Sequence, residues 1–159
     1  MSKKILAFLL VASLIALVSA YISEFFFNLQ PCILCLYQRY VFFALIGIAA
    51  LALLLRKEKF IRLSFFLCLA ALLLNTTIAS YQVGVEQKIF RGPDSCASNP
   101  SLNEITDIEE LRESLMNTKA VRCDEPQFFF MGLSMAAWNV LYCLLLFVSA
   151  AMLYRKKSN

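Results

Sequence analysis

The sequence lacks histidine and is poor in charge. None of its 159 residues is histidine, which removes the side chain that most often acts as a general base and as a metal ligand. Only 16% of the residues are charged, whereas 60% are hydrophobic and the mean hydropathy is +0.70. This composition excludes an ordinary soluble domain and indicates an integral membrane protein. Any chemistry must therefore use cysteine, carboxylate, tyrosine or a cation.

Four long runs that are almost free of charge predict membrane-spanning helices. The first, residues 5–22, is uncharged, and at 1.5 Å per residue it reaches about 27 Å, close to the thickness of a bilayer core. The other spans are expected at about 36–55, 63–85 and 128–153. We therefore predict an all-α fold, a four-helix transmembrane bundle that forms a single membrane domain over residues 1–159.

The first run has an alternative interpretation as a cleaved signal peptide. It follows a basic start and contains Val18-Ser19-Ala20, a small-residue pattern typical of cleavage sites. The run is long for the apolar core of a signal peptide, so a first spanning helix is the favoured interpretation. The remaining topology is the same in both cases.

The basic residues favour one orientation in the membrane. Nine of the fifteen Lys and Arg lie at the two termini and between residues 56 and 62, where Glu58 is the only acid. Connections rich in Lys and Arg stay on the cytoplasmic side, so we expect both termini to be cytoplasmic. The rest of the chain, Arg39 included, holds six basic and ten acidic residues. Its connections should face the periplasm or its equivalent, the compartment where disulfides form and persist.

Residues 86–127 form the only sizeable segment between the predicted spans, an outer loop. Apolar residues recur at helical spacing between 105 and 115, and Thr106 with Glu109 would form a capping box. We expect a short amphipathic helix here, on the membrane surface or on top of the bundle. Turn residues flank Cys96 on both sides, so this cysteine is expected on a loop that can swing.

Four cysteines fall on the predicted periplasmic side, in two unlike pairs. Cys32 and Cys35 form a Cys-x-x-Cys motif where the second span begins. A disulfide in such a motif exchanges readily, and the positive end of a helix starting here would favour a thiolate on Cys35. Arg39 lies one turn further along the same face, where its charge would stabilise negative charge on that sulfur or on an acceptor bound against it. We therefore predict a redox centre at the membrane surface.

The second pair, Cys96 and Cys123, encloses 26 residues of the outer loop. Two redox pairs in series imply a relay: a soluble dithiol protein reduces the loop pair, the membrane pair reoxidises it, and a lipid-soluble acceptor takes the electrons. A quinone fits, because it lives in the bilayer and takes two electrons and two protons. The alternatives are structural disulfides that staple the loop and a zinc site of four thiolates, although zinc sites usually have paired Cys-x-x-Cys knuckles.

Cys68 and Cys143 lie inside predicted spans and are interpreted as packing residues. One rival model gives them a role, because some transporters carry reducing equivalents inward through cysteines within their spans. That model requires Cys68 and Cys143 to approach one another.

Five motifs recur together along the chain. They are Pro-Cys-x-x-Cys-x-Tyr-x-Arg at 31–39, Tyr-x-x-Gly-Val-Glu at 81–86, Gly-Pro-x-x-Cys at 92–96, Arg-Cys-Asp-Glu at 122–125 and Leu-Ser-Met-Ala-x-Trp-Asn at 133–139. With them the chain resembles the disulfide bond formation protein B (DsbB) family, four-helix inner-membrane enzymes that use a quinone to reoxidise the periplasmic dithiol oxidase DsbA. The resemblance implies a protein-dithiol:quinone oxidoreductase with a DsbA-like, thioredoxin-fold partner and ubiquinone or menaquinone as its cofactor.

The same resemblance implies roles for individual residues. Cys35 is expected to be the thiolate that contacts the quinone, Arg39 its electrostatic partner, and Cys32 the sulfur that exchanges with the loop. Cys96 is expected to form the mixed disulfide with the soluble partner, and Cys123 to hand over to Cys32. Membrane lipid is the expected surrounding, and neither a metal nor a nucleic acid is expected as a partner.

The sequence departs from the family pattern at Gln82, where relatives commonly have a histidine associated with the quinone pocket. A glutamine can donate a hydrogen bond to a quinone oxygen but cannot relay a proton. Gln82 is therefore a candidate quinone ligand, and Glu86 with bound water is a candidate proton carrier. A second departure is Gln38, where relatives often have glutamate. A non-enzymic membrane protein with a stapled outer loop, and a paralogue dedicated to one special dithiol partner, are the alternative functions.

Overall fold

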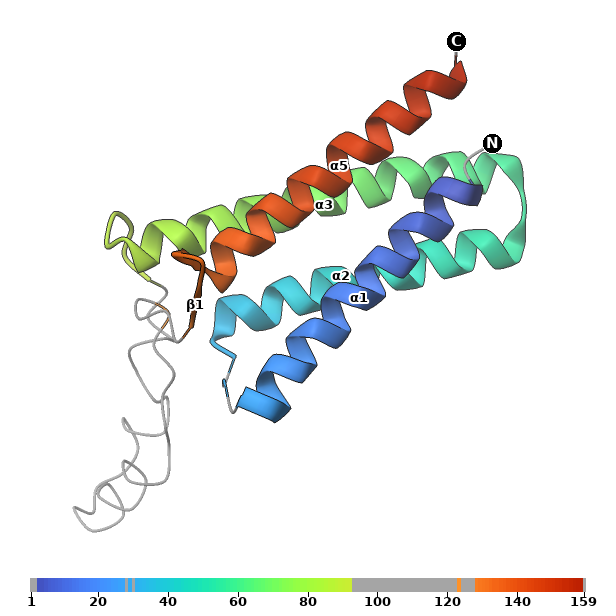
Figure 1. The fold of residues 1–159 in the computed structure, drawn as a ribbon. Helices are drawn as coiled ribbons and strands as arrows, with labels where there is room; N and C mark the ends of the chain where they lie inside the picture. The colour runs from blue at the N-terminus through green and yellow to red at the C-terminus, as the bar shows by residue number, and fades with distance from the viewer. Residues whose placement is uncertain (1–2, 28, 30, 93–122, 124–127, 159) are drawn as a thin grey trace, which may run out of the picture.

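The computed structural model describes residues 3–27, 29, 31–92, 123 and 128–158, and four long helices dominate it (Figure 1). The helices are α1 Lys3–Phe27, α2 Ile33–Leu55, α3 Glu58–Glu86 and α5 Met135–Ser158. All four are long and apolar enough to cross a membrane, which confirms the prediction of an all-α, four-helix transmembrane bundle. The amphipathic helix predicted between 105 and 115 lies outside the described residues.

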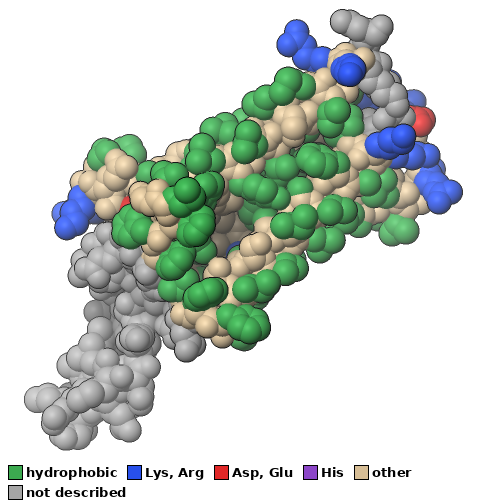
Figure 2. All heavy atoms as spheres, viewed as in Figure 1, with side chains coloured by type: hydrophobic (Ala, Val, Ile, Leu, Met, Phe, Trp, Pro, Cys, Tyr) green, Lys and Arg blue, Asp and Glu red, His purple; other side chains and the backbone are tan. Residues whose placement is uncertain are grey.

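The four helices pack around a shared apolar core. α2 lies against α1 and α3, and α3 also lies against α5, whereas α1 and α5 contact each other less extensively. Each helix contributes fully or nearly fully buried side chains to the core, among them Leu6, Leu9, Leu45, Ala49, Phe65, Leu72, Cys143 and Ala150. The surface in Figure 2 is largely apolar along the helices, as expected for a bundle whose outer faces meet lipid.

The two ends of the bundle differ in charge and in content. Figure 1 shows the N-terminus, the C-terminus and the turn between α2 and α3 at one end, and Figure 2 shows most of the Lys and Arg side chains gathered there. The start of α2 and the end of α3 lie at the opposite end (Figure 1). The basic segments that predicted one cytoplasmic side therefore do share one end of the molecule.

The helices extend beyond the apolar runs that predicted them. α3 begins at Glu58, so the predicted connection over residues 56–62 shrinks to Arg56 and Lys57, and α1 continues to Phe27. Hydropathy marks only the part of a helix that crosses the bilayer core, and charged side chains at its ends can reach the interface without interrupting the helical hydrogen bonds. Arg56 ends α2 in a left-handed conformation (φ 52°), with its N–H bonded to the Ala52 carbonyl at 3.3 Å.

The prediction that the fourth helix begins near residue 128 is wrong. A two-stranded antiparallel hairpin comes first, made of β1 Phe129–Phe130 and β2 Leu133–Ser134. Its two turn residues, Met131 and Gly132, have positive φ angles of 52° and 79°. Two such residues are what a tight hairpin turn with the right-handed twist of its strands requires. The turn was not predicted because the segment is apolar, as a membrane-spanning helix would be.

The hairpin is joined closely to the helix that follows it. The Ser134 hydroxyl accepts the backbone N–H of Ala137 at 3.2 Å, which makes Ser134 the residue that caps α5. The indole N–H of Trp138 donates to the Phe130 carbonyl at 3.0 Å and ties the first turn of α5 back to β1. Two residues of the Leu-Ser-Met-Ala-x-Trp-Asn motif therefore fix where α5 begins.

Candidate active site at the start of helix α2

Cys32 and Cys35 lie where α2 begins. Cys32 caps the helix: its backbone is extended (φ −73°, ψ 169°), and its sulfur accepts the backbone N–H of Cys35 at 3.4 Å. The two sulfurs are 3.0 Å apart, with the Cys32 thiol donating to Cys35 Sγ, whereas a disulfide would hold them at about 2.05 Å. Cys35 is in the first helical turn, where unpaired N–H groups favour negative charge. The geometry therefore stabilises a thiolate on Cys35.

Cys123 joins this pair from the other end of the outer loop. It is 3% exposed and packs with Cys32, Leu34 and Val85. A hydrogen bond with Cys123, a second with Cys35, and burial raise the pKa of the Cys32 thiol far above its ordinary value. These contacts therefore favour the protonated form of Cys32. Three of the four predicted redox cysteines meet here, and the fourth, Cys96, lies outside the described residues.

Gln82 reaches the cysteine pair from α3. It is only 4% exposed, and its amide nitrogen donates to Cys35 Sγ at 3.3 Å, with Cys32 Sγ at 3.6 Å and Glu86 Oε1 at 3.4 Å. Its amide oxygen is 3.8 Å from Cys35 Sγ, a longer contact that suits the protonated thiol. The structure thus places Gln82 at the sulfurs themselves. A contact between Gln82 and a quinone stays a prediction.

Two further amides belong to the site and were not assigned to it from the sequence. Gln38 Nε2 donates to Gln82 Oε1 at 2.8 Å, and Asn139 Nδ2 donates to Gln38 Oε1 at 2.7 Å. The two positions at which the sequence departs from the family pattern, Gln38 and Gln82, are therefore in direct contact. A polar residue inside an apolar span is the signal that could have pointed to Asn139.

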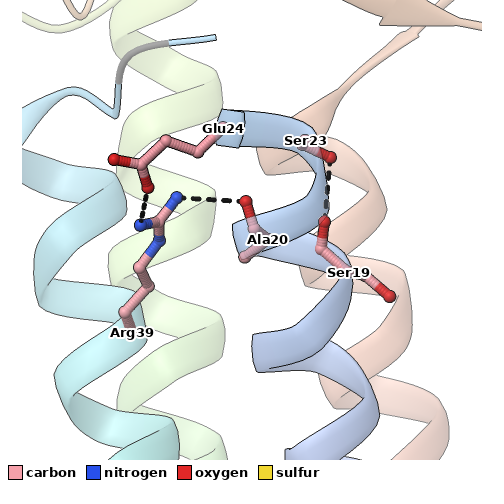
Figure 3. Close-up of polar contacts among 5 residues, drawn as sticks. All are labelled: Ser19, Ala20, Ser23, Glu24 and Arg39. Atoms are coloured by element: carbon pink, nitrogen blue, oxygen red, sulfur yellow. Dashed lines mark hydrogen bonds and ion pairs between the residues drawn. The ribbon is translucent and has the colours of Figure 1, made fainter. Parts of the chain in front are cut away.

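Arg39 extends from α2 toward α1, as Figure 3 shows. Its guanidinium forms an ion pair with Glu24, donates to the Ala20 carbonyl at 3.3 Å, and lies 4.9 Å from the centre of the Tyr21 ring. The sequence placed the Arg39 charge beside the Cys35 sulfur, but the hydrogen bonds of the guanidinium go to α1. Spacing along α2 alone cannot reveal this, because the partner comes from another helix. Glu24, an acid near the end of an apolar helix, was the missed signal.

A cavity of about 430 Å³ opens beside these groups, a volume within the range of about 300–1,000 Å³ that is typical of small-molecule sites. Its walls come mainly from apolar or small side chains of α1, α2 and α5, such as Ala16, Ala20, Phe42, Leu141 and Leu145. Cysteine, charged and amide side chains complete the lining, namely Cys32, Cys35, Gln38, Arg39, Glu86, Cys123 and Asn139. Cys35 and Arg39 therefore face the same cavity, although they do not bond to each other.

The Tyr-x-x-Gly-Val-Glu motif builds the end of α3. The carbonyl of Gly84 accepts the N–H groups of Ile89 and Phe90 at 2.9 and 3.2 Å, and the Tyr81 hydroxyl donates to the Arg91 carbonyl at 2.7 Å. A Cβ atom on Gly84 would overlap the Phe90 ring. Any larger residue at this position would force the Phe90 ring to move, because the chain folds back directly onto the helix.

Cys68 and Cys143 are both fully buried but do not face one another. Cys143 Sγ accepts a hydrogen bond from Asn75 at 3.3 Å and donates to Asn139 at 3.5 Å. Asn75 is seven residues from Cys68 on α3, which is about 10 Å along the helix axis. This placement argues against the rival model in which Cys68 and Cys143 exchange electrons.

A dithiol at the head of a membrane helix, with Cys32 buried and Cys35 partly exposed beside an apolar cavity, is the arrangement of a membrane thiol oxidoreductase. The family model described as "Disulfide bond formation protein DsbB" matches residues 2–153. The chain is also similar to "Uncharacterized protein RP370" of Rickettsia prowazekii (strain Madrid E), with 30% identity over 153 residues that cover 95% of this chain and 88% of that protein. The chain therefore belongs to the DsbB family, multi-pass membrane oxidoreductases of disulfide-bond formation.

Proposed function

We propose that the protein is a dithiol:quinone oxidoreductase that reoxidises a DsbA-like, thioredoxin-fold protein of the periplasm. In this proposal the chain acts as one membrane domain of the bacterial inner membrane, with both termini cytoplasmic. Residues 86–127 form its outer redox loop, and Cys96 and Cys123 receive electrons from the soluble partner. Cys32 and Cys35 then receive them from the loop pair.

The observation that carries the proposal is the position of Cys35. Its sulfur contacts Cys32 on one side and lines the apolar cavity on the other. A planar, lipid-soluble acceptor suits a cavity with these walls, and the Arg39 cation in its lining suits a ligand that gains negative charge. A quinone bound there would accept two electrons and two protons. The protein groups in the lining that would hold it are Cys35 and Arg39, and Gln82, which contacts Cys35 from behind the lining, is a further candidate ligand.

Two thiol–disulfide exchanges pass the electrons from the loop pair to the membrane pair, and each uses only sulfurs of this protein. The Cys123 thiolate attacks Cys32 of the oxidised pair, so the bond between Cys32 and Cys35 breaks and Cys35 leaves as a thiolate. Cys96 then attacks Cys123, which closes the loop disulfide and returns Cys32 as the leaving sulfur. Cys32 takes up a proton there, as its raised pKa favours. The contact between Cys32 and Cys123 supports the first of these steps.

The direction of electron flow follows from potentials. A DsbA-type dithiol has a reduction potential of about −120 mV, which is more oxidising than that of the common cellular dithiols. With a glutathione-type acceptor, electrons would therefore flow toward the DsbA-type protein rather than away from it. A membrane quinone can instead accept electrons from that protein through the relay. Glu86, which touches Gln82 and lines the cavity, is the proposed carrier for the protons that Gln82 cannot relay.

Quinol formation by the purified full-length protein tests this function. The protein in detergent is given a reduced thioredoxin-fold dithiol donor and a soluble quinone, and quinone absorbance is followed. We expect rapid turnover that is lost in Cys35→Ser and retained in Cys68→Ser, a matched control because Cys68 is buried and outside the site. Turnover no faster than that of Cys35→Ser, with several quinones tried, would contradict the proposal and favour a loop stapled by structural disulfides.

A further inference from the structure

A continuous row of hydrogen bonds runs through the bundle and ends at Cys35. Its links are Asn75 Nδ2 to Cys143 Sγ (3.3 Å), Cys143 Sγ to Asn139 Oδ1 (3.5 Å), Asn139 Nδ2 to Gln38 Oε1 (2.7 Å), Gln38 Nε2 to Gln82 Oε1 (2.8 Å) and Gln82 Nε2 to Cys35 Sγ (3.3 Å). We call these six residues the hydrogen-bond row. It connects α2, α3 and α5 without using a charged side chain.

All five hydrogen bonds point the same way. Each member donates to the next, so every donor group faces Cys35 and every acceptor faces back toward Asn75. The starting residue fits this direction, because Asn75 Oδ1 is buried and accepts no hydrogen bond from any residue that the structure describes. Hydrogen bonds in series polarise one another, and the effect is strongest where water is excluded. Asn75 and Cys143 are fully buried, Gln82 and Gln38 are 4% and 7% exposed, and Asn139 and Cys35 are partly exposed where they line the cavity.

We propose that the hydrogen-bond row positions Gln82 and strengthens its donation to the Cys35 thiolate, so that Cys143 and Asn139 tune the redox pair without touching it. The inference rests on the proposed redox role of Cys32 and Cys35. It assigns a function to Cys143, which the sequence marked only as a packing residue.

Gln38 and Glu86 both orient the Gln82 amide, Gln38 by donating to its oxygen and Glu86 by accepting from its nitrogen, and the bond with Gln38 is the shorter one. Because Gln38 donates to Gln82 Oε1, the oxygen of this amide is held and its nitrogen is left to face Cys35. Without the Gln38 donor, only the longer bond to Glu86 orients this amide, and its oxygen, already 3.8 Å from Cys35 Sγ, is free to move closer to the thiolate, where its lone pairs are repulsive. Asn139 holds Gln38 in the same manner, and Cys143 holds Asn139.

The row acts on one form of the pair more than on the other. Reduction of the disulfide adds two electrons, breaks the bond between Cys32 and Cys35, places one proton on Cys32 and leaves Cys35 as a thiolate. The donor dithiol is oxidised to its disulfide and supplies both electrons and the proton on Cys32, and its second proton is released to water. A hydrogen bond to the thiolate favours the reduced form, because a charged acceptor binds a donor more strongly than a neutral sulfur does. An intact row therefore makes the pair more oxidising.

The test compares two buried cysteines of the same bundle. Cys143→Ala removes a member of the row, Cys143→Ser keeps a donor and an acceptor there, and Cys68→Ala removes an equally buried thiol whose side chain makes no hydrogen bond within the described part of the chain. The full-length protein in detergent is equilibrated with reduced and oxidised dithiothreitol. The fraction of Cys32 and Cys35 in the disulfide is then measured by alkylation and peptide mass spectrometry.

We expect Cys143→Ala to lower the equilibrium constant for reduction of the pair about threefold, or about 14 mV at 29.6 mV per tenfold. Cys143→Ser and Cys68→Ala should match the unaltered protein. Asn139→Ala, one link nearer to Cys35, should lower the constant at least as much as Cys143→Ala, and it provides the test if Cys143→Ala does not fold.

Two failures are distinguishable. If the pair equilibrates with dithiothreitol but Cys143→Ala and Asn139→Ala leave its constant unchanged, or if Cys68→Ala shifts it equally, the role of the row is overturned and the proposed function stands. If the pair in the folded protein does not exchange with dithiothreitol at all, the proposed function fails and the role of the row fails with it.

Discussion

The two cysteines of the Cys-x-x-Cys motif have opposite surroundings. Cys35 accepts hydrogen bonds from the Cys32 thiol and from Gln82, whereas Cys32 is held protonated by its contacts with Cys123 and Cys35 and by burial. These surroundings favour a proton on Cys32 and negative charge on Cys35. A dithiol needs this difference if one sulfur exchanges with the loop and the other faces the acceptor.

The raised pKa of Cys32 predicts its alkylation profile. The thiolate is the reactive form, and an ordinary cysteine has a pKa of about 8.5. Alkylation of Cys32 in the reduced protein should therefore begin at higher pH than that of a free cysteine. Cys123→Ala removes the largest cause of the shift and should move the onset to lower pH. Iodoacetamide labelling followed by peptide mass spectrometry measures both. An onset that is the same with and without Cys123 would contradict this account of Cys32.

The ion pair between Arg39 and Glu24 predicts a cost when one partner is removed. The two side chains are 13% and 30% exposed, so Glu24→Gln leaves a partly desolvated cation without its counter-charge. We expect a loss of about 1–3 kcal/mol of unfolding free energy in detergent, less than for a fully buried pair. The double variant Glu24→Leu with Arg39→Met has neither charge and should recover most of the loss. A double variant no more stable than Glu24→Gln would argue against the pair.

Among the elements, the end of α3 depends most on a single residue. Gly84→Ala would push the new Cβ into the Phe90 ring and disturb the turn that follows Gln82 and Glu86. We expect a loss of about 1–3 kcal/mol of stability, as for other overpacked sites, together with slower quinone reduction. Gly47→Ala in α2 is the control, because its Cβ would meet nothing within 4 Å and should stabilise the helix slightly. Equal thermal midpoints for the two variants would contradict this reading.

The elements themselves were largely predictable from the sequence, and their ends were not. Long apolar runs revealed all four spans, because a helix is the structure that satisfies its backbone within a bilayer. The hairpin before α5 was missed, since Met131 adopts a positive φ angle that is rare outside glycine and asparagine. Ser134, a standard capping residue directly before the helix, was the available signal.

At the scale of the whole molecule, the site was predictable only as far as its motifs reach. Cys32, Cys35 and Gln82 stand in recognisable motifs, and the structure brings them together. The contacts of Asn139 with Gln38 and of Glu24 with Arg39 join different helices at sequence separations of 101 and 15 residues. No spacing rule within one helix can supply such contacts, because they depend on how the helices pack.

The arrangement of charge predicts the orientation of the molecule. Lys59 and Lys88 are exposed and lie near opposite ends of α3, which makes them a matched pair for labelling. With the basic end cytoplasmic, Lys88→Cys should react with a membrane-impermeant maleimide in intact spheroplasts, whereas Lys59→Cys should react only after the membrane is permeabilised. The unaltered protein gives the background from native cysteines. The reverse pattern would invert the proposed topology.

The most direct test of the central claim is a single turnover of the fully reduced, full-length protein. One equivalent of quinone is added without oxygen, and quinol formation is compared with the disulfide found by alkylation and peptide mass spectrometry. We expect quinol to form as fast as the disulfide between Cys32 and Cys35, before any disulfide between Cys96 and Cys123. Unreduced quinone, or a loop disulfide that forms while Cys32 and Cys35 stay alkylatable, would contradict the claim that electrons leave through Cys35.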